Sequence, residues 1–314
     1  MCYHIYEDKI CYKTQGADSM SKKIDIIVAN PAGNTTIFVL TPVPVEEYGE
    51  ITESLLKIDF GKDFDVRFTC PDSESVMGEQ VGFILPESEG ELPGFNMSGL
   101  EFCGNASRAF AYYQAACLGK GTPLEGGVET IRIRTSGCSH PLTARIDAKA
   151  DFAEIRMPLP VNITKFSSEE LDLANENPDL IDCFLIDMDG ISHLILDNIT
   201  ATPEKFNKIR DYVYDKAGDM DAFGVMFIDR ITDYVTPVVY VRDVNTTYFE
   251  GSCASGTAAA AFVRGMEKYD GEYSFTFRQP AGTLYTTIKK ESGQIAEISL
   301  SGLLELSDVI SIEL

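Results

Sequence analysis

The sequence repeats one order of predicted elements, and this repetition constrains the fold more than any other feature. In each half of the chain one helix is expected to begin directly after a cysteine, at Cys103 and at Cys253, 150 positions apart. The tripeptide Ala-Glu-Ile also recurs, starting at Ala153 and at Ala296. Similarity over so long a period indicates two related structural units. The alternative is a chance similarity between two α+β halves.

Alternation of apolar and polar residues, bounded by turn residues, predicts the strands of both halves. In the first half they fall at 24–29, 36–40, 81–85, 131–134, 142–146 and 153–157. In the second half they fall at 184–186, 194–196, 225–228, 238–241, 273–277, 284–288 and 296–300. Helices are predicted at 46–56, 104–116, 203–216 and 254–265, and a turn at 96–99. This pattern predicts an α+β fold.

The expected boundaries are an N-terminal extension at 1–22, a first half at 23–160 and a second half at 161–314. The last strands are the ones that could cross back to the first half. Of the 314 residues 44% are hydrophobic, which is enough for a sizeable core.

The net charge of −23 makes binding to nucleic acid or to an anionic membrane improbable. No apolar run reaches the roughly 18–20 residues that a membrane-spanning helix needs. The first twenty residues also show no apolar core typical of a signal peptide. The sequence therefore predicts a cytoplasmic protein.

Eight cysteines and three histidines do not form a metal-binding pattern. No two cysteines have the C-x-x-C spacing, so a zinc cluster is not expected. In a reducing compartment a disulfide framework is not expected either. A Ser-His-Asp triad stays formally open, through His193 alone.

Cys103 and Cys253 are each followed by small residues at the predicted start of a helix. Free backbone N–H groups and the helix dipole favour a negative charge there, which can be a thiolate or a carboxylate, and can lower a thiol pKa. A lone cysteine at a helix start is usually inert, but two at matching places favour chemistry. Two thiols on opposite faces of one carbon could exchange its proton and invert its configuration. Arg108, on the first of these helices, is interpreted as a surface or domain-packing residue.

Several short motifs, in a fixed order, carry a family resemblance. They are Asn30-Pro31-Ala32-Gly33-Asn34, Gly78-Glu79-Gln80-Val81, Asn96-Met97-Ser98-Gly99, Cys103-Gly104-Asn105, Cys253-Ala254-Ser255-Gly256-Thr257 and Gln279-Pro280-Ala281-Gly282. Together they resemble the diaminopimelate epimerase superfamily of cofactor-independent, two-cysteine racemases, and within it the histidine racemase branch. The resemblance implies two similar, mostly antiparallel β domains, each wrapped around a central helix, with the active site in the cleft between them.

The same resemblance implies roles for individual residues. Cys103 and Cys253 match the two acid/base thiols, and His193 falls near a supporting histidine of the family. The residues matched to substrate binding are Asn34, Glu79, Gln80, Asn96, Gly104, Asn105, Glu250, Ala254, Ser255 and Gly256. No cofactor and no metal are implied.

Departures from the diaminopimelate epimerases bear on the substrate. The chain lacks the Glu-Arg pair expected before the second cysteine and has the shorter run 247–252 in its place. Without that arginine a second substrate carboxylate has no clamp. Glu79 and Glu250 could instead bind an ammonium or imidazole group, so we expect interconversion of L- and D-histidine.

Other functions stay open. The enzymatic alternatives are diaminopimelate epimerase and a racemase of another polar amino acid. The non-enzymatic alternatives are an amino-acid-binding module and a thiol redox sensor. The expected partner is a free amino acid, with no nucleic acid or membrane, and a homodimer stays open.

Overall fold

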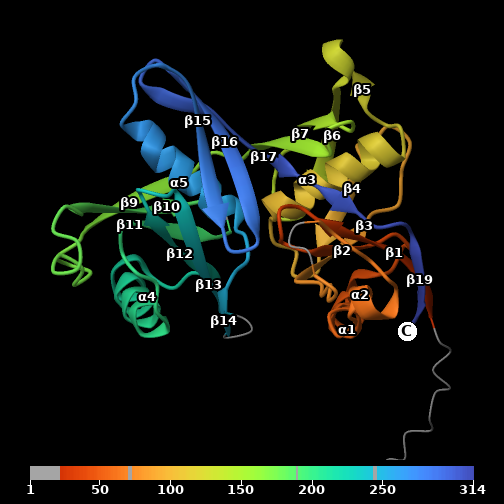
Figure 1. Ribbon diagram of the computed structural model, residues 1–314, viewed down its shortest axis with the longest axis horizontal. Helices are drawn as coiled ribbons and strands as arrows, with labels where there is room; N and C mark the ends of the chain where they lie inside the picture. Colours follow the sequence, from red (N-terminus) through yellow and green to blue (C-terminus); the bar gives the residue numbers. More distant parts are fainter. Residues whose placement is uncertain (1–21, 70–72, 189, 243–245) are drawn as a thin grey trace, which may run out of the picture.

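The computed structural model describes residues 22–69, 73–188, 190–242 and 246–314 (Figure 1). Residues 1–21 of the expected N-terminal extension lie outside this range. The described chain combines a mixed β structure with few helices, which confirms the predicted α+β class. Figure 1 shows the first half around α3 (Gly104–Tyr112) and the second half around α5 (Ala254–Met266).

The first half begins with four strands that pair in sequence order. They are β1 (Lys23–Asn30), β2 (Thr36–Val39), β3 (Gln80–Ile84) and β4 (Gly94–Met97). β1 and β2 are antiparallel, β2 and β3 are parallel, and β3 and β4 are antiparallel. β4 then pairs in parallel with β6 (Glu129–Thr135). The parallel step from β2 to β3 is bridged by a short 3-10 helix (Val45–Glu47), α1 (Tyr48–Leu55) and α2 (Phe60–Asp63).

The second half has the same order of pairings. Its strands are β10 (Asp182–Asp187), β11 (Ser192–Asp197), β12 (Ala222–Asp229), β13 (Tyr234–Val241) and β15 (Gly271–Gln279). Successive pairs are antiparallel, parallel, antiparallel and parallel. α4 (Pro203–Ala217) bridges β11 and β12, as α1 bridges β2 and β3.

Strands from both halves form one continuous antiparallel run. β6 is followed by β7 (Leu142–Asp147) and β8 (Phe152–Met157), and β15 by β16 (Gly282–Glu291) and β17 (Gln294–Leu303). β8 pairs with β17, so the order is β6-β7-β8-β17-β16-β15. After β17 the chain returns to the first half, where β18 (Glu305–Leu306) and β19 (Ile310–Glu313) pair with β1.

α3 and α5 share the largest hydrophobic core. Every residue of α3 is buried, and the core that it joins also takes in Ala258 to Ala261 of α5. α3 packs on β8, while α5 packs on β16 and β17. Two smaller cores lie under α1 and under α4. Because one core contains both central helices, packing fixes the position of each helix relative to the other.

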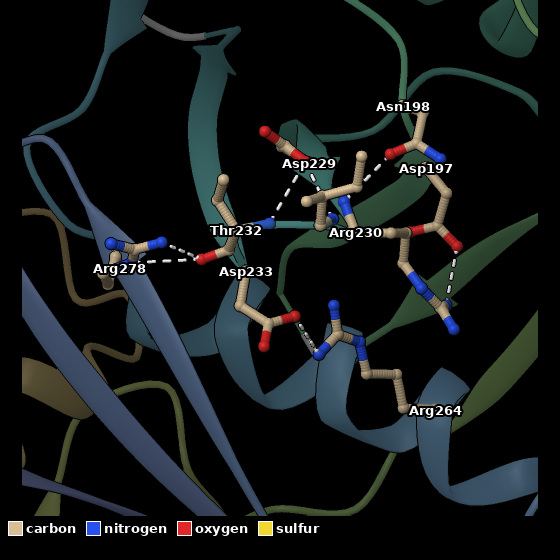
Figure 2. A network of polar contacts seen from close by, with 9 residues as sticks. Asp197, Asn198, Asp229, Arg230, Thr232, Asp233, Arg264 and Arg278 are labelled. Carbon is tan, nitrogen blue, oxygen red and sulfur yellow. Dashed lines mark hydrogen bonds and ion pairs between the residues drawn. The ribbon is translucent and has the colours of Figure 1, made fainter.

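A polar network fixes the C-terminal end of α5 (Figure 2). The guanidinium of Arg264 lies 2.8 Å from Asp233 Oδ1 and stacks over the ring of Phe277. Arg278 Nε donates to the carbonyl of Thr232 at 3.0 Å. These contacts tie the end of α5 to β15 and to the loop before β13, so the opposite end of α5 points in a defined direction.

Several elements differ from the sequence prediction. The turn expected at 96–99 is wrong in its first half, because Asn96 and Met97 continue β4 and pair with β3. The helix expected at 104–116 is an α-helix only to Tyr112 and continues as a π-helix (Tyr113–Cys117). Besides β4, five short strands are not predicted: β5 (Thr122–Pro123), β9 (Asn162–Ser167), β14 (Thr246–Phe249), β18 and β19. No helix of the described residues is long and apolar enough to span a membrane.

Candidate active site

Cys103 and Cys253 occupy the same structural position at the starts of α3 and α5. Each is the N-cap residue, with φ −131° and ψ 113° for Cys103, and φ −124° and ψ 109° for Cys253. Four residues further on, a buried hydroxyl donates back to the cap carbonyl: Ser107 Oγ at 2.8 Å and Thr257 Oγ1 at 2.5 Å. The first N–H groups of a helix have no backbone partners, and here Ala106 N–H and Gly256 N–H are hydrogen-bonded to the sulfurs of Cys103 and Cys253.

The two helix starts touch each other. A Cβ atom placed on Gly104 would lie 3.0 Å from Ala254 Cβ and 2.8 Å from Met157 Cε. A side chain at 104 would therefore separate the helices, and glycine permits the close approach. Since Gly104 and Ala254 directly follow Cys103 and Cys253, the structure brings the two caps to one place. The positive ends of both helix dipoles meet there, which favours an anion such as a carboxylate.

A network of amide side chains from the first half lies beside Cys103. Gln80 Nε2 donates to Asn34 Oδ1 at 2.7 Å, and Asn105 Nδ2 donates to the same oxygen at 3.3 Å. Asn34 Nδ2 in turn donates to Glu79 Oε2 at 2.7 Å. Four of the predicted substrate-binding residues are thus joined by hydrogen bonds. Asn34 and Asn105 are buried, whereas Glu79 is exposed as a residue, with its carboxylate end held by Asn34.

On the second half, a histidine supports the start of α5. His193 Nε2 and Ser255 Oγ are 2.8 Å apart, and Ser255 Oγ lies 3.8 Å from Cys253 Sγ. His193 is fully buried on β11, and burial lowers the pKa of its imidazole to about 3. The imidazole is therefore neutral and acts on Cys253 only through Ser255. Gly256 completes the turn against Met226, whose Sδ would lie 2.2 Å from a Cβ on Gly256.

Glu250 is the charged group that both thiols share. It precedes Cys253 by three residues, and its side chain is hydrogen-bonded to the Cys253 thiol. Its negative charge raises the pKa of Cys253 and, more weakly, that of Cys103. Burial raises the pKa of the Glu250 carboxyl itself to about 7, and the nearby Glu79 adds to this shift. Within the described chain neither Glu79 nor Glu250 forms an ion pair with a lysine or arginine.

The thiol pKa values differ from the sequence expectation. A helix start was expected to lower them, yet burial raises the pKa of Cys103 to about 11, against hydrogen bonds from Ala106 N–H and Gln80 that favour the thiolate. Burial likewise raises the pKa of Cys253, and Glu250 raises it further. Desolvation outweighs the helix dipole because the dipole supplies only partial charges. Without a ligand both groups are therefore thiols.

Asn96 is not brought to this cluster. It pairs with Phe83 across β3 and β4, and its side chain is hydrogen-bonded to Tyr48 of α1. The neighbouring residue Met97 faces the other side of the sheet, toward the core that contains α3. Successive side chains of a strand point to opposite faces, so Asn96 lies on the α1 face, away from Cys103.

Arg108 is fully buried, which excludes the surface part of its interpretation. Its Nη1 donates to the carbonyl of Leu303 at 3.2 Å and thereby joins α3 to the end of β17. Burial lowers the pKa of its guanidinium to about 9.

Three residues with no predicted role also hold the two caps by hydrogen bonds: Gln279, Thr257 and Ser107. Within the described residues no group of three or more His, Cys, Asp or Glu side chains is arranged to hold a metal ion.

The fold is that of a known class of enzymes. A crystal structure of a hydroxyproline epimerase from Agrobacterium vitis superposes with a TM-score of 0.54, over 93% of this chain and 93% of that chain, at 10% sequence identity. The relatives described next, which share this fold class with it, show that the protein is an amino-acid racemase.

The chain belongs to the family described as the histidine racemase CntK N-terminal domain, whose model matches residues 23–309. It is 29% identical over 292 residues to a histidine racemase of Fusobacterium nucleatum subsp. nucleatum, which covers 87% of this chain and 93% of that protein. It is 24% identical over 273 residues to a histidine racemase of Staphylococcus aureus, which covers 83% of this chain and 87% of that protein. The family resemblance expected from the motifs is thereby confirmed.

Proposed function

We propose that this protein interconverts L- and D-histidine, with one of Cys103 and Cys253 taking the Cα proton and the other delivering its own proton to the opposite face. The observation that carries the proposal is the contact between Gly104 and Ala254, which joins two cysteine caps of nearly equal dihedral angles. The histidine racemases among its relatives support the choice of substrate. We further propose that the two halves are duplicated domains, that the site is the cleft between them, and that the enzyme works in the cytoplasm.

In this proposal the substrate carboxylate binds the two helix starts. The free N–H groups that follow Cys103 and Cys253 point at one place, where they and the dipoles bind an anion. With the carboxylate fixed there, Cα lies between the two sulfur atoms. One sulfur, as thiolate, takes the proton from Cα. The other, as thiol, gives its proton to the opposite face of the same carbon, and the configuration is inverted.

Helix-start N–H groups also stabilise the intermediate charge. Removal of the Cα proton sends negative charge onto the carboxylate oxygens, which gain enolate character. Donors already aimed at those oxygens stabilise this charge without having to reorganise, and they do so most strongly where water is excluded. Binding histidine also lowers the cost of forming a thiolate, since its cationic groups offset the charge of Glu250, which raises the pKa of both thiols.

Glu79 and Glu250 give the proposal its preference for histidine. Both are carboxylates without a lysine or arginine counter-ion in the described chain, and Glu250 is hydrogen-bonded to Cys253. The ammonium and the imidazole of histidine offer N–H donors to such groups, and a charge-assisted hydrogen bond is worth about 1.5–3 kcal/mol. The second carboxylate of diaminopimelate would instead be repelled. We assign Asn34, Gln80 and Asn105 to hold the substrate on the first half, and His193 to support Ser255.

The test is chiral chromatography of the purified protein incubated with a panel of L-amino acids and diaminopimelate. We expect D-histidine to form fastest and, in deuterium oxide, to carry deuterium at Cα. Faster conversion of diaminopimelate or of another polar amino acid would overturn the histidine assignment. An absence of deuterium incorporation with every substrate would favour a binding module or a redox sensor.

A further inference from the structure

Gln279, the last residue of β15, holds the backbone of Cys253 on both sides. The backbone N–H of Cys253 donates to Gln279 Oε1 at 2.8 Å. Gln279 Nε2 donates to Thr257 Oγ1 at 2.8 Å, and Thr257 Oγ1 donates to the carbonyl of Cys253 at 2.5 Å. Gln279 is 5% exposed and Thr257 is fully buried, so this chain of hydrogen bonds is shielded from water. Both peptide groups of the cap are therefore fixed, the N–H by Gln279 directly and the carbonyl by Gln279 through Thr257.

The residues after Gln279 connect the Cys253 cap to the first half of the chain. The backbone N–H of Ala281 donates to the carbonyl of Gly251 at 2.9 Å, two residues before Cys253. Ala281 also packs on Gly33, where a Cβ would lie only 2.3 Å from Ala281 Cβ. Gly33 has φ +90°, a conformation that favours glycine, and it directly precedes Asn34. The turn after β15 thus connects the cap of α5 with the amide network of the first half.

The first half holds its cap differently. The strand end that corresponds to Gln279 is Thr135 on β6. The preceding residues, Arg278 and Arg134, pair in parallel with the first residues of β13 and β4. Thr135 Oγ1 is buried and has no hydrogen-bond partner in the described structure, so it does not hold the backbone of Cys103. The sulfur of Cys103 accepts from Ala106 N–H at 3.4 Å, and the sulfur of Cys253 accepts from the equivalent Gly256 N–H, so this bond is common to both caps. The hydrogen bonds from Gln279 to the cap are therefore specific to Cys253 and are not repeated at Cys103.

We infer that Gln279 is a positioning residue for Cys253, because it fixes the direction of the thiol. Through the turn that follows it, this direction also depends on how the first half packs against the second. This inference rests on the proposed function, in which Cys253 must face the substrate Cα. The donors that favour the Cys253 thiolate, Gly256 N–H and Ser255 Oγ, reach the sulfur only while the cap keeps its geometry. Loss of the hydrogen bonds from Gln279 should weaken these contacts and leave Cys103 unaffected.

The test compares Gln279→Met, which keeps length and packing but loses both hydrogen bonds, with Thr286→Val as a control. Thr286 is a buried residue of β16 whose hydroxyl has no partner in the described structure. We expect Gln279→Met to lower kcat/KM for histidine about 10- to 100-fold, since small misplacements of reacting groups have effects of this size. The control should stay within about twofold of the wild type.

Iodoacetamide labelling provides a readout that a general loss of structure would not give. Peptide mass spectrometry follows the alkylation of Cys253 and Cys103 in the same sample across a pH series. We expect the pH midpoint of alkylation to rise for Cys253 in Gln279→Met and to stay unchanged for Cys103. Thr257→Val should give the same pattern, and the double variant should lose less than the two single effects combined, because both residues act in one chain of hydrogen bonds.

The outcomes separate this inference from the proposed function. If the wild type racemises no amino acid, the proposed function fails, and the labelling still decides whether Gln279 controls Cys253. If the wild type is active but Gln279→Met matches Thr286→Val in kcat/KM and in labelling, the inference is wrong. Equal shifts at both cysteines would also overturn it. If Gln279→Met does not fold, Thr257→Val carries the same comparison.

Discussion

The starts of α3 and α5 have one geometry and two different surroundings. Their cap dihedral angles agree within about ten degrees, and both cap carbonyls accept from a hydroxyl four residues later. Around Cys103 the neighbours are the neutral amides of Asn34, Gln80 and Asn105, together with Glu101, whose charge raises the pKa of the thiol. Around Cys253 they are a carboxylate, a neutral imidazole and Gln279. The backbone that presents a thiol is thus shared, while the groups that set its reactivity are not.

This difference fits a reaction that is symmetric in geometry but not in its substrate. In the proposed reaction both thiols must reach the same carbon from opposite sides, which requires matched backbones. The remainder of an amino acid, however, extends toward one side only. Glu250 on the Cys253 side is then the group that selects the substrate, whereas the amide network on the Cys103 side positions it. Four experiments test this division, from the largest expected effect to the smallest.

Removal of either sulfur should abolish racemisation. Cys103→Ala and Cys253→Ala each delete one of the two proton carriers, so we expect kcat/KM for histidine to fall by about 10³-fold or more. Thermal unfolding followed by circular dichroism should remain close to the wild type, since neither sulfur contributes much to the core. A variant that keeps a tenth of the activity would show that the two caps are not equivalent partners.

Replacement of Glu250 should affect binding and both thiols together. Glu250→Gln removes the charge that faces the substrate cation, and we expect kcat/KM to fall about 10- to 100-fold, mostly through KM. Because this charge raises the pKa of Cys253 and of Cys103, both alkylation midpoints should move to lower pH. Glu79→Gln should have a smaller effect, as Glu79 is more exposed.

The control for these carboxylates is Glu204→Gln, an exposed position at the start of α4. It changes the net charge by the same amount at a distance from the cysteines. If Glu204→Gln and Glu250→Gln gave equal losses, the effect would come from overall charge, and the role of Glu250 would be wrong.

His193 should make stability depend on pH. Burial lowers its pKa to about 3, from a usual value near 6.5, so the neutral imidazole contributes stability above pH 6.5 that is lost as the pH falls toward 3. Each pKa unit corresponds to about 1.4 kcal/mol. Between pH 7.5 and 4.5, urea denaturation should show the wild type losing about 3 kcal/mol more than His193→Gln. Equal losses would mean that the imidazole becomes charged within the fold.

The hydroxyls that brace the two cap carbonyls should give the smallest effects. Ser107→Ala removes one hydrogen bond at the α3 start and should lower the free energy of unfolding by about 1 kcal/mol. Thr257→Val removes the matching bond at α5 and also leaves Gln279 Nε2 without its acceptor, so we expect a larger loss in the same urea titration. Equal losses in the free energy of unfolding would contradict the additional hydrogen bond from Gln279 at the Cys253 cap.

Local patterns in the sequence determined much of this structure. Small residues after Cys103 and Cys253 predict two helix starts, and both occur at the expected residues. The order of strands in each half follows from alternation and turn residues. These features depend on neighbours within a few positions, which is why one sequence is sufficient to predict them.

The errors arise where a single contact decides between two local options. Asn96 looks like a turn residue three positions before a glycine, but pairing with Phe83 extends β4 through it and turns its side chain toward Tyr48. Arg108 carries a charge that favours solvent, yet it is fully buried and donates to Leu303 on a distant strand. Neither partner is marked in the sequence near these residues.

The sequence by itself determined where the two cysteines stand on their helices, because capping depends on the residues that directly follow. Only the tertiary structure decided what those thiols experience. The backbone of Cys253 is hydrogen-bonded to Gln279, 26 residues away in the sequence. Ser255, beside the Cys253 sulfur, is hydrogen-bonded to His193, which is 62 residues away. Desolvation by the surrounding core then raises both thiol pKa values above what a helix start alone would give. Burial and charge act through space, so they exist only once the chain has folded.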